Sequence, residues 1–345
     1  MDYLVNAWYV AGFADELEQG KPLARTLLGQ PVVFFRNESG GVTALADRCA
    51  HRFAPLSAGK VSAHGRAIEC PYHGLQFGAD GKCTHNPHTD GAIAKSAAVT
   101  AYCAVERDRL VWWWAGDAAA ADHSLIPDFS DITQAPDDAT IRGYMPTACR
   151  YDLLVDNILD LTHADYLHAG SLGSGAITRC KPTVEAVSNR SIRVQWVSSG
   201  DKAPAAFDAF LGGLGRPTDQ WTEVVWTAPS CMHLRVGATL LGQPRDQGVD
   251  TSNLHLATPE SETTCHYWFW STRDFAISPQ ANAHIRSMVE FAFTQQDKPM
   301  LEAQQRRIGS ADFWSLKPVL LQGDAGAVRV RRALDKLIAA ERAAT

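Results

Sequence analysis

The sequence has no excess of basic residues, no long apolar run and no dense set of cysteines. Its 345 residues include 32 Lys and Arg against 38 Asp and Glu, which gives a formal net charge of −6. Because no basic excess is available to neutralise phosphates, we do not expect nucleic acid as a partner. No window reaches the roughly 18 uninterrupted apolar residues of a membrane-spanning helix, so no membrane partner is expected. Eight cysteines in a chain of this length do not indicate a disulfide scaffold.

The N-terminus also lacks the features of a secretory signal. The short apolar stretch between Asp2 and Asp15 has no basic segment before it. We therefore expect a cytoplasmic protein, in a reducing compartment where grouped thiols serve metals or catalysis more often than disulfides. The length exceeds that of a lone electron carrier and predicts two domains of ordinary size.

Patterning along the chain predicts where these domains divide. Up to about residue 115, short strand patterns alternate with turn residues, as in the hairpin that 31–45 predicts. An alanine-, aspartate- and proline-rich stretch follows. We predict one domain over 1–120 and a second over 121–345. The second is expected to contain helices over 151–169, 280–307 and 325–343, and strands around 192–196, 224–226 and 266–270.

Two short segments of the first domain each contain one cysteine and one histidine. They are Cys49 with His51, and Cys70 with His73. A structural zinc site is one interpretation, but such sites more typically pair their thiols as C-x2-4-C and keep their histidines together. One Cys and one His in each loop instead favours a Rieske [2Fe–2S] centre, in which two Cys hold one iron and two His hold the other. The remaining cysteines follow no such pattern and are expected to be ordinary core or surface residues.

A second group of polar residues lies in the first predicted helix of the second domain. Asn157, Asp160, His163 and His168 interrupt an otherwise apolar segment, and a helical wheel places Asp156 on the same face as Asp160 and His163. Buried polar groups need partners, and a metal ion supplies one. The two histidines lie about 140° apart on an ideal helix. They can share an ion only if the helix ends between them or is distorted, for example by a π-type irregularity. The alternative is a histidine pair that caps the helix C-terminus.

A carboxylate would complete a facial triad for non-haem Fe(II), with positions left open for O2. The candidate is Asp297, at the edge of the apolar stripe of the predicted helix over 280–307. Pro299 removes a backbone donor and disturbs the helix beside it. The alternative is that Asp297 caps a second helical piece that begins near Lys298.

With these motifs, the chain resembles the oxygenase components of the Rieske non-haem iron aromatic oxygenases. It is similar above all to the group of vanillate and dicamba O-demethylases and toluenesulfonate methyl monooxygenase. The matching residues are Arg52, Gly59, Phe77 and the segments 54–56, 71–74, 86–88, 156–163, 258–263, 266–269 and 297–304. The resemblance implies an α+β fold, with an N-terminal all-β Rieske [2Fe-2S] domain and a C-terminal helix-grip catalytic domain. It also implies a head-to-tail homotrimer.

The resemblance assigns roles to the candidate residues. Cys49, His51, Cys70 and His73 would hold the [2Fe-2S] cluster, and His163, His168 and Asp297 would hold the Fe(II). Asp160 would be the electron-transfer bridge from His73 of one chain to His163 of the next. As an acceptor for the ring of His163 it would also fix the tautomer of that histidine. Asn157 would lie beside the iron ligands.

The implied activity is a monooxygenase reaction. NADH-derived electrons, delivered by a reductase directly or through a ferredoxin, would be used with O2 to hydroxylate a methoxy or methyl carbon of an aromatic, carboxylated compound. A hydroxylated methoxy group then releases formaldehyde, which is O-demethylation. Two alternatives remain open, a ring-hydroxylating dioxygenase of the same superfamily and an electron-transfer protein without oxygenase activity.

Four residues are candidates for contact with the substrate. His255 matches a position that meets a substrate carboxylate in a relative, and Met288 occupies a position that is aromatic in another. His233 and Arg235 alternate on one strand face and would supply further polar contacts. For this last pair, solvated or interface side chains are the equal alternative.

Overall fold

The structure is a computed structural model that describes residues 2–344, and it consists of two compact units. The first unit comprises the chain up to Asp128 together with Thr258–Glu262, and the second comprises Phe129–Ala257 and the chain from Thr263. None of the helices in residues 2–344 is both long enough and apolar enough to cross a membrane.

The stretch that follows the last strand of the first unit is bonded to that unit. Trp8 Nε1 donates to the main-chain oxygen of Asp122 at 2.8 Å, and Arg107 donates to that of Ile126 at 3.2 Å. These bonds explain why the units divide after Asp128, whereas the change in composition predicts a division near residue 120.

The first unit contains three antiparallel sheets. Their strand orders are β1-β11-β10, β2-β3-β4-β9 and β5-β6-β7-β8. The strands are β1 (Trp8–Phe13), β2 (Leu23–Leu27), β3 (Gln30–Arg36), β4 (Val42–Ala46), β5 (Lys60–Val61), β6 (Ala67–Glu69), β7 (Gln76–Gly78), β8 (Cys83–His85), β9 (Ala101–Tyr102), β10 (Ala104–Arg107) and β11 (Leu110–Trp114). The hairpin predicted over 31–45 is formed by β3 and β4.

Short 3-10 helices connect these strands and continue into the second unit. They are η1 (Ala14–Glu16), η2 (Leu56–Ala58), η3 (Ala63–Gly65), η4 (Ala118–Ala120), η5 (His123–Leu125), η6 (Asp137–Ala139), η8 (Ile177–Arg179), η9 (Arg245–Gln247), η11 (Trp314–Leu316) and η12 (Gln322–Asp324). None exceeds one turn, as is usual for this helix type.

The core of the first unit reaches the two segments that contain the Cys–His pairs. Cys49 and Cys70 belong to one buried apolar cluster with Phe35, Leu45 and Phe77. Packing of each cysteine against strand residues fixes the base of each segment, because well-packed interiors leave few alternative positions.

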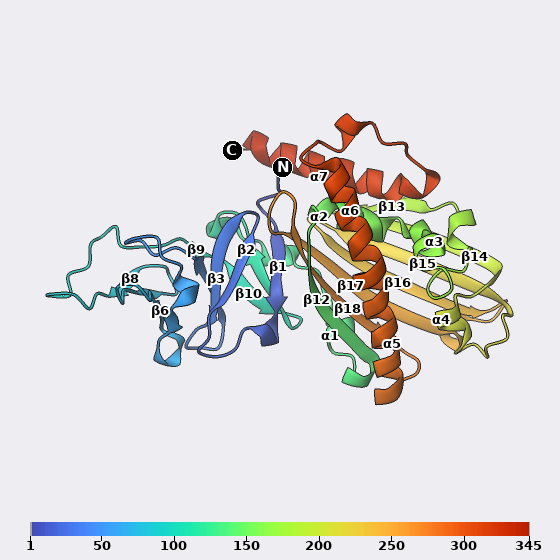
Figure 1. Cartoon of the computed structure of the whole chain (residues 1–345), viewed down its shortest axis with the longest axis horizontal. Helices are drawn as coiled ribbons and strands as arrows, with labels where there is room; N and C mark the ends of the chain where they lie inside the picture. The colour runs from blue at the N-terminus through green and yellow to red at the C-terminus, as the bar shows by residue number, and fades with distance from the viewer. Residues whose placement is uncertain (1, 345) are drawn as a thin grey trace. The chain divides into compact units, whose positions relative to one another are not determined.

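The second unit is built on a seven-stranded sheet with the order β12-β18-β17-β16-β15-β14-β13 (Figure 1). Its strands are β12 (Thr140–Thr147), β13 (Thr183–Ser188), β14 (Ser191–Lys202), β15 (Pro217–Thr227), β16 (Cys231–Leu240), β17 (Val249–Pro259) and β18 (Cys265–Arg273). The three predicted strands lie within β14, β15 and β18. From β13 to β18 each strand neighbours the next one in the sequence, and β12 is the strand added at the far edge.

The helices of this unit include α5 and α6, which run across the strands in Figure 1. They are α1 (Ser130–Thr133), α2 (Tyr151–Leu159), η7 (Leu161–His163, a 3-10 turn), α3 (Ala164–Leu167), α4 (Ala205–Asp208), α5 (Pro279–Phe291), η10 (Ala292–Asp297, a π-helical segment), α6 (Lys298–Ile308) and α7 (Ala325–Ala344). The cap Ser278 accepts a bond from Ala281 N at the start of α5, where Pro279 needs no backbone partner. Gly309, with φ 62°, ends α6.

Two predicted helices differ from the structure in an informative way. The helix expected over 151–169 ends at Leu159, because Asp160 has φ −127° and ψ 82°, and the short turns η7 and α3 follow. The helix expected over 280–307 is interrupted by η10. The histidine pair requires a helix that ends or is distorted, and the short turns η7 and α3 meet that condition, whereas the π-type irregularity lies in the segment that contains Asp297.

Candidate functional site

The two Cys–His segments of the first unit have the same main-chain hydrogen bonds. The main-chain N of Cys49 donates to the oxygen five residues later at 2.8 Å, and its oxygen accepts from the N four residues later at 3.0 Å. Cys70 makes the same two bonds, also at 2.8 and 3.0 Å. In each segment the fifth residue has a positive φ, 61° at Phe53 and 74° at Gly74. The two ligand loops are therefore structural copies of each other.

These loops separate the thiols from the imidazoles. Cys49 and Cys70 are each 1% exposed, whereas His51 is exposed and its ring centroid lies 4.5 Å from that of His73. Burial raises the pKa of the Cys49 thiol, so a thiolate there needs a cation beside it. An inner pair of thiols and an outer pair of imidazoles fit a cluster with one iron on each pair.

A second group of ligands is assembled in the second unit from three elements. His163 ends η7, His168 follows α3, and Asp297 ends η10. The Nε2 atoms of His163 and His168 lie 3.5 and 3.2 Å from Oδ1 of Asp297, and the three ligand atoms lie within 4.8 Å of one another. Burial disfavours protonation of His168, but Asp297 outweighs that effect and raises the pKa of His168. The site thus attracts positive charge.

The other ring nitrogen of each histidine faces an acceptor. His163 Nδ1 lies 2.6 Å from the main-chain oxygen of Asp160, and His168 Nδ1 lies 2.7 Å from Oε1 of Gln296. An acceptor at Nδ1 keeps the proton there and leaves the Nε2 lone pair facing Asp297. Two free lone pairs and a carboxylate fit a divalent cation with open positions.

The π-helical segment η10 explains how two adjacent residues reach one site. Its wider turn lets Gln296 contact Nδ1 of His168 while Asp297 faces Nε2 of the same ring. Asp297 is 7% exposed, and its side chain makes no capping bond to α6. The alternative interpretation of Asp297 as a helix cap is therefore wrong.

Asn157 lies beside the candidate iron ligands, and Asp160 contacts the ring of His163 through its main chain. Asn157 Nδ2 lies 3.4 Å from His163 Nε2 and 3.5 Å from Asp297 Oδ1. The carboxylate of Asp160 accepts from Thr162 N at 3.2 Å and from Thr162 Oγ1 at 2.6 Å. Within the chain, the main-chain oxygen of Asp160 and not its carboxylate holds the ring of His163, because the α2 helix ends at this residue.

The helical wheel is wrong for Asp156. This residue faces Arg331 of α7, which donates to both of its carboxylate oxygens at 2.6 to 3.0 Å. Once α2 stops at Leu159, residues on either side of the stop no longer share a face.

The geometry agrees with what comparison with known proteins shows. Two family models match the chain, the Rieske [2Fe-2S] domain over residues 7–102 and the vanillate O-demethylase oxygenase C-terminal domain over residues 147–340. The oxygenase component of dicamba O-demethylase from Stenotrophomonas maltophilia is 40% identical over 339 residues, 98% of each chain. This chain belongs to the Rieske non-haem iron oxygenases.

Other relatives of this Rieske oxygenase agree. The oxygenase component of chloroacetanilide N-alkylformylase from Rhizorhabdus wittichii is 38% identical over 341 residues, 98% of this chain and 97% of that one. The crystal structure of dicamba monooxygenase bound to 3,6-dichlorosalicylic acid has a TM-score of 0.92 and 38% identity, and the match covers 99% of this chain and 100% of that chain.

Membership of this family establishes the enzyme class, the cofactors and the fold. The enzyme is the oxygenase component of a Rieske monooxygenase, and its cofactors are a [2Fe-2S] cluster and a mononuclear non-haem iron. The α+β fold, with an N-terminal Rieske domain and a C-terminal catalytic domain of sheet and helices, is confirmed. As one component of a larger system, the oxygenase receives its electrons from a separate protein.

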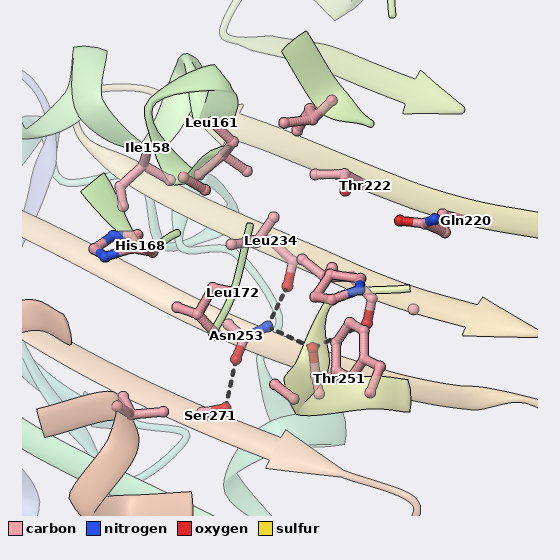
Figure 2. A pocket seen from close by; sticks show the side chains of 18 of the residues that line it. Ile158, Leu161, His168, Leu172, Gln220, Thr222, Leu234, Thr251, Asn253 and Ser271 are labelled. Carbon is pink, nitrogen blue, oxygen red and sulfur yellow. Dashed lines mark hydrogen bonds between the residues drawn. The ribbon is translucent and has the colours of Figure 1, made fainter. Parts of the chain in front are cut away.

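A cavity of about 210 Å³ lies in the second unit of the oxygenase and includes the candidate iron ligands in its wall. Figure 2 shows Ile158 of α2 and Leu161 of η7 among its lining residues, together with residues of the sheet such as Leu234 and Asn253. The wall is mostly apolar, which suits a ring-shaped apolar ligand.

Asn253, Thr251 and Ser271, labelled in Figure 2, form hydrogen bonds with one another and with the main chain of the wall. Asn253 Nδ2 donates to Leu234 O and to Thr251 Oγ1, both at 3.1 Å, and Ser271 Oγ donates to Asn253 Oδ1. Thr251 Oγ1 in turn donates to Val236 O at 3.0 Å. These amide and hydroxyl groups are satisfied without a ligand.

Of the four candidate substrate contacts, His255 and Met288 line the cavity. His233 and Arg235 do not. Their side chains lie on the other face of β16, where His233 Nε2 is 2.7 Å from Ser252 Oγ and Arg235 bonds Asp250 at 2.7 Å. The strand alternates as expected, but it is Leu234 that faces the cavity.

Three residues in or near the site have no signal in the sequence that predicts their contacts. Gln296 is signalled only by its position next to Asp297, and it counts only because η10 turns both residues toward His168. Tyr267 meets His255 through the pairing of two strands, and Arg331 meets Asp156 across 175 residues of chain. Local sequence patterns do not predict contacts between residues that lie on different elements.

Proposed function

We propose that the protein O-demethylates, or hydroxylates the methyl group of, a small aromatic compound. The observation that carries the proposal is the position of His163, His168 and Asp297 on the wall of a mostly apolar cavity. Relatives named as O-demethylases match nearly the full length of this chain, which supports the same reaction class.

In this proposal Cys49, His51, Cys70 and His73 hold the [2Fe-2S] cluster, and His163, His168 and Asp297 hold the Fe(II). The two metal centres supply O2 activation and one-electron transfer, chemistry that side chains lack. The net reaction consumes a methoxyarene, O2, two electrons and two protons, and it gives a hydroxymethoxy product and water. That hemiacetal breaks its carbon–oxygen bond to give a phenol and formaldehyde.

The chain's own residues place the substrate and keep water out. The apolar side chains of Ile158, Leu172 and Leu234 leave an aromatic ring without competing polar partners. Exclusion of water strengthens the interactions between the charged groups that remain. Asn157, within 3.5 Å of Asp297 Oδ1, donates to that carboxylate and holds it toward the histidines.

We further propose a head-to-tail homotrimer in which His73 of one copy meets Asp160 of the next. Support comes from exposure. Phe53 and Tyr72, beside the histidines of the cluster loops, are 68% and 65% exposed, and Asp160 is half-buried. A second copy would cover such apolar side chains. An NADH-dependent reductase, acting directly or through a ferredoxin, would supply electrons in the cytoplasm.

The test is a screen of methoxylated and methylated aromatic acids with a surrogate NADH-dependent reductase, with formaldehyde release as the readout. Formaldehyde in proportion to NADH oxidised is the expected result. A cis-diol product without formaldehyde would instead establish a ring-hydroxylating dioxygenase, and electron uptake without any product would establish an electron-transfer protein.

Asp160→Asn tests the proposed electron path. We expect normal iron content and a normal cluster spectrum with turnover reduced about 100-fold or more, since the amide cannot carry the negative charge that links two imidazoles. Glu185→Gln, an exposed carboxylate on β13 of the same unit, is the matched control and should keep full turnover. Full turnover in Asp160→Asn would show that electrons take another path.

A further inference from the structure

A segment with little regular structure forms part of the cavity wall in the second unit. This wall segment, residues 169–180, follows the candidate iron ligand His168 and contains the 3-10 turn η8 and one isolated bridge, between Ala169 and Gly173. Main-chain N–H groups outside helices and sheets need other acceptors, so the wall segment depends on groups elsewhere in the fold. Its residues on the cavity wall are Leu172, which Figure 2 labels, Ser174, Ala176, Ile177 and Cys180.

The carboxylate of Asp165 supplies the missing acceptors. Its Oδ1 accepts from the main-chain N of Ser174 at 3.1 Å and from that of Gly175 at 2.7 Å. Its Oδ2 accepts from Thr178 N at 2.9 Å and from Thr178 Oγ1 at 2.6 Å. Within residues 2–344 no Lys, Arg or His forms an ion pair with this carboxylate, so its hydrogen bonds all go to the wall segment. Bonds to a charged oxygen are about twice as strong as those between neutral groups.

The wall segment also touches the main chain of α3. A Cβ added at Gly173 would lie 2.2 Å from Ala164 O and 2.7 Å from Asp165 Cα, so glycine is needed for this close approach. Asp165 itself belongs to α3, two residues after His163 and three before His168. The cavity wall and the turn that joins two candidate iron ligands are therefore fastened to each other at one side chain.

The attachment extends to a second part of the wall. The main-chain N of Ala206, in α4, donates to Ser171 O of the wall segment at 3.2 Å. Both Ala206 and Phe207 line the cavity. Since α4 is a single turn without a side-chain cap, its position depends on contacts of this kind. Release of the wall segment should loosen α4 as well.

We propose that Asp165 is a positioning residue for the oxygenase reaction, which fastens the wall segment over the substrate and so holds the oxidisable carbon at the iron with water excluded. This inference rests on the proposed function and deepens it. With the wall fastened, O2 and two electrons are spent on the substrate carbon. With the wall released, part of the O2 takes up the same two electrons and two protons and leaves as hydrogen peroxide. Asp165 therefore sets the yield of product per O2 consumed.

The first measurement is hydrogen exchange of the main-chain amides of Ser174, Gly175 and Thr178, in enzyme loaded with cluster and iron and without reductant. Asp165→Ala should speed their exchange about 10-fold or more, because these amides lose their acceptors. Asp165→Asn should show a smaller effect, since its amide oxygen can still accept from Ser174 and Gly175. Exchange within α2 should not change.

The second measurement is the yield of product, with a surrogate reductase and the best compound of the aromatic screen. Formaldehyde, hydrogen peroxide and O2 are followed together. In Asp165→Ala we expect peroxide per O2 to rise about 5-fold or more and KM to rise about 3- to 10-fold, because the bound ring is held less firmly. Asp165→Asn should recover part of the yield. Loss of stability alone would give fewer turnovers at an unchanged ratio of peroxide to formaldehyde.

Variants in the wall segment separate its position from the charge of Asp165. Gly173→Ala pushes the segment away from α3 while the carboxylate stays, and it should raise the peroxide yield as Asp165→Ala does. Thr178→Val removes one bond from an exposed residue and should raise the yield about 2-fold. Added to Asp165→Ala, Thr178→Val should have no further effect, because its partner is already absent.

A matched control is found on β15. Asp219 accepts from the main-chain N of Gly242 at 2.8 Å and from the hydroxyl of Ser199, which are bonds of the same two kinds. Its side chain does not belong to the cavity wall. Asp219→Ala should leave both the peroxide yield and the exchange of the wall segment unchanged.

Three results would overturn the inference. They are unchanged exchange of the wall segment in Asp165→Ala, faster exchange with an unchanged peroxide yield, and an equal peroxide yield in Asp219→Ala. If Asp165→Ala loses iron, Thr178→Val decides, because it leaves α3 intact; a wild-type peroxide yield in that variant would contradict the proposal. Absence of any product from the wild type would contradict only the proposed function, since exchange is measured without turnover. Formaldehyde release with the same yield in every variant would contradict only the role of Asp165.

Discussion

Arg331→Met should destabilise the catalytic unit through the helix that leads into the iron site. Arg331 Nε and Nη2 donate to both carboxylate oxygens of Asp156 at 2.6 to 3.0 Å, and Nη1 donates to Asp152 at 2.7 Å. The side chain of Arg331 is only 11% exposed. It therefore joins α7 to α2, the helix that contains Asn157 and ends next to Asp160.

The expected loss of folding stability depends on which cationic partners Asp152 and Asp156 keep after the substitution. Asp152 keeps its two bonds to Arg150, at 2.6 and 2.7 Å, whereas Asp156 loses its only cation. Removing one partner of a buried ion pair costs about 3–5 kcal/mol, and one remaining partnered carboxylate places this case near 3 kcal/mol. For a unit of this size the melting temperature should fall by roughly 6–12 °C.

The cost should also depend on pH. Burial raises the pKa of Asp156 to about 6 from its ordinary 3.8, although Arg331 acts in the opposite direction. An acid whose pKa is raised in the folded state binds its proton more tightly there, so this group's contribution to stability is present at low pH and is lost as the pH rises to about 6. Loss of Arg331 removes a force that lowers this pKa, so the variant's deficit should be smaller at pH 5 than at pH 8.

The assay is urea unfolding of wild type and variant at pH 5 and pH 8, with iron content measured in parallel. Arg329→Met, on the exposed face of α7 two residues earlier, is the control and should change the unfolding free energy by about 0.5 kcal/mol or less. Asp156→Leu combined with Arg331→Met should recover much of the loss, since a neutral pair leaves no buried charge. A deficit under about 1 kcal/mol, or one equal at both pH values, would refute the reasoning.

Three further changes test the two metal centres. Gln296→Leu removes the acceptor of His168 Nδ1 and should weaken Fe(II) binding about 10- to 100-fold with the cluster spectrum intact; unchanged iron affinity by metal titration would contradict this role. In Gly323→Ala, the added Cβ would lie 2.7 Å from Asp160 Oδ1, so electron delivery measured by single-turnover kinetics should slow while iron content holds. Cys70→Ser should abolish cluster absorption and leave the mononuclear iron in place. Retained cluster absorption would show that the Cys70 thiol is not a ligand.

Local motifs made the metal centres predictable. Each Cys–His pair lies within four residues, so a single loop places both side chains whatever the surrounding sheets do, and one Cys and one His in each loop favour a Rieske cluster over zinc. His163 and His168 are similarly close in sequence. Their spacing showed that a regular helix could not bring them together, and the structure ends α2 at Leu159.

The face of a strand or helix that meets the cavity could not be predicted in the same way. Alternation in β16 places His233 and Arg235 on one face, but it does not say which face the cavity is on, and Leu234 proves to be the residue that lines it. The same limit applies to Asp156. A helical wheel assumes that the helix continues, but Asp160 leaves the helical conformation and its side chain caps the following turn η7.

The contacts that decide chemistry in the cavity are the ones hardest to see in the sequence. Three histidines face this cavity, and the partner of each Nδ1 determines what its Nε2 can do. A main-chain oxygen beside His163 and an amide oxygen beside His168 keep the proton on Nδ1, so both Nε2 atoms offer lone pairs to a cation. His255 differs from both, because its Nδ1 lies 2.6 Å from a hydroxyl oxygen, that of Tyr267. An obligate acceptor thus stands behind the two rings that approach Asp297, whereas a hydroxyl stands behind the third.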